Sequence, residues 1–207
     1  MKIGIIGAGN VGSALATASV RAGHTVSITS AVSSEAENVV AQLNGAARAV
    51  GSNGEAVDGA DLLILAVPFD SVNDIVKEVG SGLDGKVLID VTNRFAPEQL
   101  DGPSNAELIQ KMAPKAVVVK AINTIFASHQ ADPTIDGIQL DGFVAGDDAT
   151  AKGKVLEYVG SLGFRPIDAG PIAMSRALEG MGTLNISLNA ANGWPWQTGW
   201  KLLGPTS

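Results

Sequence analysis

A glycine-rich segment near the start of the chain carries the clearest chemical signal. Gly7, Gly9 and Gly12 satisfy the pattern G-x-G-x-x-G within the string GAGNVG, between an apolar run and a stretch with helical spacing. In that context the pattern is typical of a turn that binds the pyrophosphate of a dinucleotide, and the alternative is a purely structural glycine turn. Gly7 would permit the tight turn, Gly9 would let the backbone approach the phosphates, and Gly12 would let helix and strand pack closely. The free N–H groups of Asn10 and Val11, at the positive end of the helix, would hold the phosphates.

The residues that follow the second predicted strand bear on the choice between NAD and NADP. An acidic residue about 20 positions beyond the glycines would bind the ribose 2′-hydroxyl of NAD. That place holds Thr29, Ser30 and Ala31, and the first acidic residue beyond it is Glu35. Without a carboxylate to repel it, a 2′-phosphate is tolerated, and the hydroxyls of Thr29, Ser30 and Ser33 could receive it. The usual arginine is absent, so the preference for NADP rests on hydroxyl groups that could also be ordinary helix caps.

Other strand ends would meet the glycine turn at one edge of a parallel sheet, where ligands of such folds bind. Pro68 could form a wall beside the ribose and the nicotinamide, or simply end a strand. Asn93 and Asn123 could bind the nicotinamide amide, or serve as turn residues. The candidate cofactor-binding residues at these strand ends are Ala66, Val67, Pro68, Asn93, Ala121 and Asn123.

The sequence offers few residues for acid–base chemistry. His24 precedes the second strand and is expected to be structural, whereas His129 follows an apolar stretch and could reach the site. Tyr158 is the only tyrosine and lies on a covering helix. Lys120 is either a buried lysine or a solvated charge at the rim, and the rarity of buried lysines favours the rim. We therefore assign no catalytic side chain and no metal site, and Asp147-Asp148 is expected to cap a helix.

This scarcity favours hydride transfer between two redox cofactors, which requires alignment of two rings. Reduction of a ketone or hydroxy acid would require a placed Lys, His or Tyr.

The composition excludes several classes of protein. The 207 residues include 45% hydrophobic and 17% charged side chains, so the chain can form a sizeable core. A net charge of -7 argues against nucleic acid and anionic membrane as partners. The absence of cysteine excludes disulfides, thiolate catalysis and cysteine-bound metals, and it is compatible with the cytoplasm. No apolar run is long enough for a membrane span. Glycines interrupt the first twenty residues, which favours a strand, turn and helix there over a secretory signal.

Hydrophobic periodicity predicts alternating strands and helices. Strands are expected over residues 2–7, 25–29, 47–50, 61–67, 86–91, 116–120, 138–145 and 164–168. Helices are expected over residues 10–22, 33–44, 72–79, 104–112, 150–160 and 174–191. This pattern predicts an α/β, doubly wound, mostly parallel sheet of Rossmann type with a small C-terminal helical extension. Residues 1–120 would form the dinucleotide-binding domain, and 121–207 would complete the sheet and cover the site within one compact unit.

Four strings spread along the chain carry a family resemblance: GIIGAGNVG, VVKAINTIFA, VAGDDATAKGKV and GFRPIDAGPIAMSRALE. Together they resemble the deazaflavin (coenzyme F420)-dependent NADP oxidoreductase family, whose relatives include the reductase domain of membrane ferric reductases. The resemblance implies a compact, usually dimeric Rossmann-type protein with NADP at Gly7–Gly12. It implies a nicotinamide near Pro68, Asn93 and Asn123. A second cofactor would stack on the nicotinamide and take the hydride, and no side chain would act as a strong acid.

Two departures from the family pattern leave the hydride acceptor open. The family often carries a basic residue after the second strand, where this chain has Ala31-Val32. The tail contains all three tryptophans within 194–200, either as a stacking wall for a flavin-like acceptor or as a clamp onto the core or a partner.

The leading interpretation is an NADP-dependent oxidoreductase that passes a hydride between NADPH and a deazaflavin or FMN. One alternative is a reductase of a small organic substrate, with Arg94 and Arg176 as candidates for a carboxylate clamp. The other alternative is a non-catalytic NADP-binding sensor.

Overall fold

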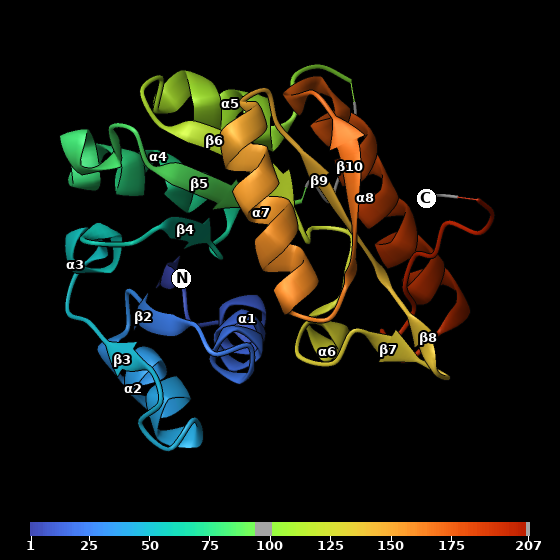
Figure 1. Cartoon of the computed structure of the whole chain (residues 1–207), viewed down its shortest axis with the longest axis horizontal. Helices are drawn as coiled ribbons and strands as arrows, with labels where there is room; N and C mark the ends of the chain where they lie inside the picture. Colours follow the sequence, from blue (N-terminus) through green and yellow to red (C-terminus); the bar gives the residue numbers. More distant parts are fainter. Residues whose placement is uncertain (94–100, 206–207) are drawn as a thin grey trace.

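The computed structural model of the protein describes residues 1–93 and 101–205, and an eight-stranded sheet forms its centre (Figure 1). The strands lie in the order β10-β9-β6-β5-β4-β1-β2-β3. The six strands from β3 to β6 are parallel, β9 runs antiparallel to β6, and β10 is parallel to β9. The strands are β1 Lys2–Ile6, β2 Thr25–Thr29, β3 Arg48–Ala49, β4 Leu62–Leu65, β5 Val87–Asp90, β6 Val117–Ala121, β9 Asp141–Ala145 and β10 Arg165–Gly170.

Helices connect the strands. They are α1 Asn10–Arg21, α2 Ser33–Gln42, α3 Asn53–Val57, α4 Phe69–Val79, α5 Asn105–Met112, α6 Ala127–Gln130, α7 Ala149–Ser161 and α8 Ser175–Asn192. Single 3-10 turns occupy Gly80–Leu83 (η1) and Ile172–Met174 (η3), and a small hairpin pairs β7 Thr134–Ile135 with β8 Ile138–Gln139. None of these helices, within the residues that the structure describes, is both long and apolar enough to cross a membrane.

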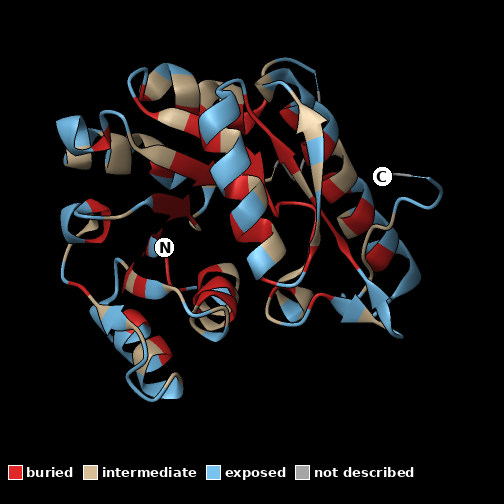
Figure 2. Cartoon of the chain, viewed as in Figure 1, coloured by how far each residue is buried: buried red, intermediate tan, exposed pale blue. Residues whose placement is uncertain are grey.

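Two helical layers cover the sheet, because successive strand residues point to opposite faces. In β4, Leu62 and Ile64 pack with apolar residues of α1, α2 and α7, whereas Leu63 and Leu65 pack with residues of α3, α4 and α5. Figure 2 shows the resulting pattern, in which buried residues concentrate on the strands and on the inner sides of the helices. Fully apolar strands therefore have a partner layer on each face, as a buried parallel sheet requires.

The predicted fold class is confirmed, and the differences lie in one strand beyond β6 and in a few short elements. The strand predicted over 138–145 is two strands, since β8 pairs with β7 and β9 joins the central sheet. Leu140 stands at the break, where its N–H donates to the carbonyl oxygen of Pro133 at 2.8 Å. The short elements α3, α6 and β7 were not predicted, because their few residues carry too little periodicity.

A buried carboxylate in β9 holds the C-terminal tail. Asp141 has no exposed surface, and it accepts two hydrogen bonds of 2.6 Å from the Arg165 guanidinium. It also accepts hydrogen bonds from the Lys201 ammonium at 3.0 Å and from the Leu202 N–H at 2.7 Å. Residues 200–202 are thereby fixed to the sheet, with the N–H of Asp141 donating to the carbonyl oxygen of Trp200.

The tryptophan-rich segment packs against α6. The rings of Trp196 and Phe126 meet edge to face with centroids 5.7 Å apart, and Ser128 donates a hydrogen bond to the carbonyl oxygen of Trp196. These contacts match the clamp interpretation of the tail, although Trp194 and Trp196 keep more than two fifths of their surface exposed.

The hydrogen bonds to Asp141 predict acid-sensitive stability. Burial alone would raise the pKa of Asp141, but the hydrogen bonds from Arg165, the Leu202 N–H and Lys201 lower the pKa below its usual value. The stabilisation is therefore complete above a pH of about 4 and is lost as the pH falls through the folded-state pKa. We expect Asp141→Asn to lower the free energy of unfolding at neutral pH by about 2 kcal/mol or more, measured by urea denaturation. The difference from the unchanged protein should shrink towards pH 3.

Asp84→Asn is the matched control, because the Asp84–Lys115 ion pair is exposed. Its cost should stay below about 1 kcal/mol. An equal loss in both variants would contradict the role given to Asp141.

Candidate functional site

The glycine turn joins β1 to α1 under tight steric constraints. Gly7 has a φ of +108°, and its N–H donates to the carbonyl oxygen of Thr29 at 2.9 Å. A Cβ atom on Gly7 would lie 2.2 Å from the Ala66 carbonyl oxygen, and one on Gly12 would lie 1.9 Å from the Gly7 carbonyl oxygen. Both positions therefore require glycine for packing, whether or not a ligand binds.

Gly9 differs, because nothing in the protein requires a glycine there. Its φ of −71° suits any residue, and a Cβ atom on it would meet no atom within 4 Å. No side chain caps the start of α1. The first N–H groups of a helix have no intrahelical acceptor and carry the positive end of the helix dipole. The exposed space beside Gly9, next to these donors, fits a phosphate group.

A cleft of about 730 Å³ opens on one side of the turn, beside the ends of β1, β2 and β4. The predicted cofactor-binding residues that line it are Gly7, Gly9, Thr29, Ser30, Ser33, Ala66, Val67 and Pro68. Sequence reasoning missed its four acidic side chains, Glu35 on α2 and Asp70, Asp74 and Glu78 along the length of α4. The cleft therefore unites the turn and the end of β2 as predicted, with a more negative lining than expected.

A second pocket has a volume of about 150 Å³. Three more of the predicted cofactor-binding residues line it: Val11, Asn93 and Asn123. The Nδ2 of Asn123 donates to Asn93 Oδ1 at 2.8 Å and to the Leu178 carbonyl oxygen at 2.9 Å. Helix α8 closes this pocket with Gly182, where a Cβ atom would lie 2.5 Å from Asn93 Oδ1. The close approach of α8 to Asn93 thus requires a glycine.

Two buried polar atoms of this second pocket have no hydrogen-bond partner among the described residues: Asn123 Oδ1 and Thr124 Oγ1. Asn123 and Thr124 are only 5% and 3% exposed. Ile122 precedes them with a φ of +62°, a left-handed conformation that is rare for a β-branched residue. Unsatisfied buried groups and backbone strain concentrate at binding sites, so this strand end fits an amide-bearing ligand.

The remaining predicted residues lie elsewhere. Asn10 is exposed at the start of α1, while Gly12 and Ala121 are buried and line neither cavity. Arg94 lies outside the described residues. Arg176 forms an ion pair of 2.6 Å with Glu107, and its hydrogen bond lowers the pKa of Glu107 to about 2.

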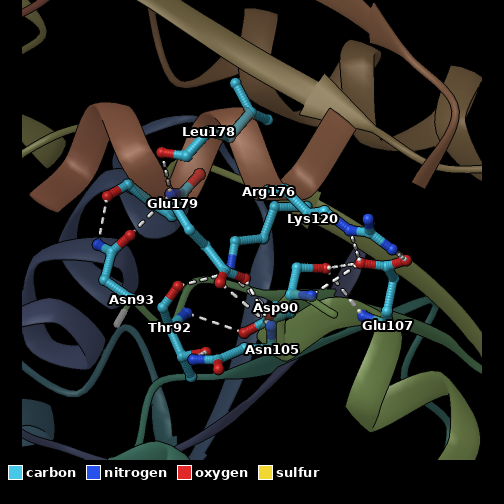
Figure 3. Close-up of polar contacts among 11 residues, drawn as sticks. Asp90, Thr92, Asn93, Asn105, Glu107, Lys120, Arg176, Leu178 and Glu179 are labelled. Atoms are coloured by element: carbon cyan, nitrogen blue, oxygen red, sulfur yellow. Dashed lines mark hydrogen bonds and ion pairs between the residues drawn. The ribbon is translucent and has the colours of Figure 1, made fainter. Parts of the chain in front are cut away.

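Lys120 corrects the prediction of a rim charge. It has no exposed surface, and its ammonium group lies 2.8 Å from both Asp90 Oδ2 and Glu179 Oε1 (Figure 3). It also donates to the Thr92 carbonyl oxygen at 2.5 Å. Lysines are rarely buried, but this one is buried because two carboxylates, from β5 and α8, compensate its charge. We call Lys120, Asp90 and Glu179 the charged cluster. Asn105 adds an N–H that donates to both oxygens of Glu179.

The other candidate proton donors are engaged away from both cavities. His24 is structural, as expected, and hydrogen bonds to the N-terminus and to Ser161. The hydroxyl of Tyr158 is buried against Ser19 at 2.8 Å, and burial raises its pKa. His129, which was predicted to be able to reach the site, bonds instead to the carbonyl oxygen of Gln197. Asp148 caps α7, which confirms the predicted cap.

Removal of the cation of the charged cluster should be costly. Lys120→Met would leave Asp90 and Glu179 buried next to each other without a counter-charge, so we expect a loss of about 3–5 kcal/mol in the free energy of unfolding. Lys115→Met, which breaks an exposed pair, should change the free energy of unfolding far less by the same denaturation measurement. A cost for Lys120→Met as small as that of the control would show that the cluster contributes little.

Comparisons with known proteins agree with this architecture. The sequence profile of the family described as "NADP oxidoreductase coenzyme F420-dependent" matches residues 2–94. The metalloreductase STEAP3 of Rattus norvegicus is 33% identical over 180 residues, 86% of this chain and 36% of the relative. The F420-dependent NADP reductase of Methanocaldococcus jannaschii is 27% identical over 148 residues, 66% of each protein.

Among solved structures, a proposed F420-dependent NADP reductase from Arthrobacter sp. FB24 superimposes with a TM-score of 0.85 at 28% identity, covering 98% of this chain and all of that one. The chain thus spans about a third of the length of the STEAP3 relative, two thirds of the archaeal reductase and the whole of the Arthrobacter structure. The glycine turn and all the lining residues given for the larger cleft fall within the residues that the family profile matches. The comparisons therefore support the predicted resemblance of this chain to the coenzyme F420-dependent NADP oxidoreductase family, which the profile matches over residues 2–94.

Proposed function

We propose that the chain transfers a hydride between NADPH and a second redox cofactor, a deazaflavin or a flavin such as FMN. One observation carries the choice of reaction: no ionisable side chain is among the described residues that line the second pocket. They are Val11, Asn93, Asn123, Thr124, Ile125, Phe126, Ala127, Gly182, Asn185 and Ile186.

An uncharged lining suits a reaction that needs no proton donor. Reduction of a carbonyl group requires a positioned acid, whereas transfer between two cofactor rings requires orientation and exclusion of water. Among the described residues, Lys120, Tyr158 and both histidines are bonded to other groups of the protein. Arg176 is already paired with Glu107, which disfavours its use as a clamp for a substrate carboxylate.

In this proposal each cavity binds one end of NADPH, which supplies the hydride. The N–H groups at the start of α1 bind the pyrophosphate, and Gly9 leaves space for it. Val67 and Pro68 flank the middle of the cofactor in the larger cleft. Asn123 Oδ1 and Thr124 Oγ1 bind the carboxamide and orient the ring. Residues before position 121 thus bind most of the dinucleotide, while the part of the chain that follows adds Asn123 and Thr124 and covers the site.

The deciding experiment follows the absorbance of NADPH with purified protein, with coenzyme F420 and FMN supplied separately and a reaction without acceptor as the control. We expect turnover with one of the two acceptors. Tight NADPH binding without turnover by either would contradict the proposal and favour the two other functions, a reductase of a small organic substrate or an NADP-binding sensor.

Gly9 gives a direct test of the phosphate site. Gly9→Val should lower NADPH affinity by about 100-fold or more, because the branched side chain would occupy the space assigned to the pyrophosphate. The melting temperature should change little, because the φ of Gly9 is one that any residue adopts and because a Cβ atom there meets no other atom. Calorimetric titration measures the first effect and thermal unfolding the second.

Gly153→Val on α7 is the control, because Gly153 also has nothing within 4 Å and lies outside both cavities. It should bind NADPH normally. Unchanged affinity in Gly9→Val would exclude this turn as the pyrophosphate site.

We also propose a cytoplasmic homodimer that associates through α8. Leu184 and Leu188 are 49% and 38% exposed on this helix, and no charged residue occurs between positions 180 and 200. We expect a double variant, Leu184→Asp with Leu188→Asp, to behave as a monomer in light scattering coupled to gel filtration. Val32→Asp, at an exposed apolar residue beside α2, should remain dimeric. A monomeric unmodified protein would refute this assembly.

A further inference from the structure

We propose that Glu35 determines how this chain discriminates between NADPH and NADH. Its carboxylate would accept a hydrogen bond from the ribose 2′-hydroxyl of NADH and would lower the affinity for the 2′-phosphate of NADPH. NADH thereby becomes a usable cofactor alongside NADPH. The inference rests on the proposed function, because it concerns the adenosine end of the same dinucleotide site.

The position of Glu35 supports this role. Ser30 follows the last residue of β2, and Glu35 lies in the first turn of α2. The Ser30 hydroxyl donates to Glu35 Oε2 at 2.5 Å, and both residues line the larger cleft. The carboxylate is therefore held at the end of β2, where a dinucleotide-binding fold places the ribose 2′ position.

The charges that line the cleft disfavour a phosphate. A phosphate monoester carries close to two negative charges at neutral pH and is normally bound by arginine or lysine. The described residues lining the cleft include four carboxylates, those of Glu35, Asp70, Asp74 and Glu78, and no lysine, arginine or histidine. On α4, Lys77 lies 3.8 Å from Asp74 and is not part of the lining.

The first turn of α2 does not offset this charge. A helix N-terminus attracts one anion through its N–H groups and its dipole. Glu35 is the acidic residue of that first turn, so the protein's own carboxylate already benefits from this attraction. A 2′-phosphate would have to compete with it. A neutral 2′-hydroxyl instead supplies a donor that the carboxylate can accept.

Binding measurements on the complete chain test the inference without relying on turnover. Titration calorimetry would give the Kd of NADPH and NADH, and of the fragments adenosine 2′,5′-bisphosphate and AMP. We expect Glu35→Gln to raise the preference for NADPH over NADH by about tenfold, because one full charge is removed next to a dianion. Glu35→Arg should raise it further, and the fragments should follow the same order.

Glu37→Gln supplies the matched control, because Glu37 is an exposed carboxylate of the same helix outside the cleft. It should leave the preference unchanged. The effect of Glu35→Gln should also shrink at high ionic strength, since it acts between charges near solvent.

The outcomes separate this inference from the proposed function. If both dinucleotides bind and neither Glu35 variant changes their ratio, the role of Glu35 is overturned while the site stands. If the unmodified protein binds neither dinucleotide, the proposed function fails and this inference fails with it. A preference that shifts in the Glu35 variants and stays constant in Glu37→Gln would establish it.

Discussion

The carboxyl edge of the sheet depends on the ionic contacts of Lys120. This lysine, at the penultimate position of β6, compensates Asp90 from β5 and Glu179 from α8 where none of the three is more than 1% exposed. One cation and two carboxylates leave an excess negative charge, which the N–H groups of Thr92 and Asn105 help to stabilise. Buried charges are tolerated only when they are paired and hydrogen bonded in this way. The charged cluster therefore connects α8, near the C-terminal end of the chain, to β5 and β6, which lie much earlier in the sequence.

The second pocket follows from that connection. Helix α8 contributes Gly182 and Asn185 to its lining, and the Leu178 carbonyl oxygen fixes Asn123. A displacement of α8 would separate Gly182 from Asn93, whose contact allows no side chain between them. The two ends of the candidate site consequently differ in construction: the larger cleft lies on consecutive strand–helix units, while the smaller pocket requires a distant helix.

The sequence predicted the local parts of this arrangement and missed those that depend on distant contacts. Strand periodicity and the glycine pattern identified the Rossmann-type sheet and the residues Gly7 to Gly12, because their geometry is encoded within a few positions. The prediction of Lys120 at the rim rests on the rarity of buried lysines, and its partner Glu179 is too remote in sequence to be recognised as a counter-charge. A role for Glu35 could not be predicted, because strand spacing alone does not show that the first turn of α2 folds back over Ser30.

The acidic lining of the larger cleft has a consequence for the speed of binding. Dinucleotides are anions, and a cleft with four carboxylates in a protein of net charge -7 repels them during approach. Added salt screens that repulsion, so encounter with the cofactor becomes faster as ionic strength rises. In proteins that bind nucleotides in basic grooves, the rate of encounter instead falls as the ionic strength rises. An acidic cleft would thus capture every dinucleotide more slowly in dilute buffer, and a physiological salt concentration would largely remove this kinetic cost.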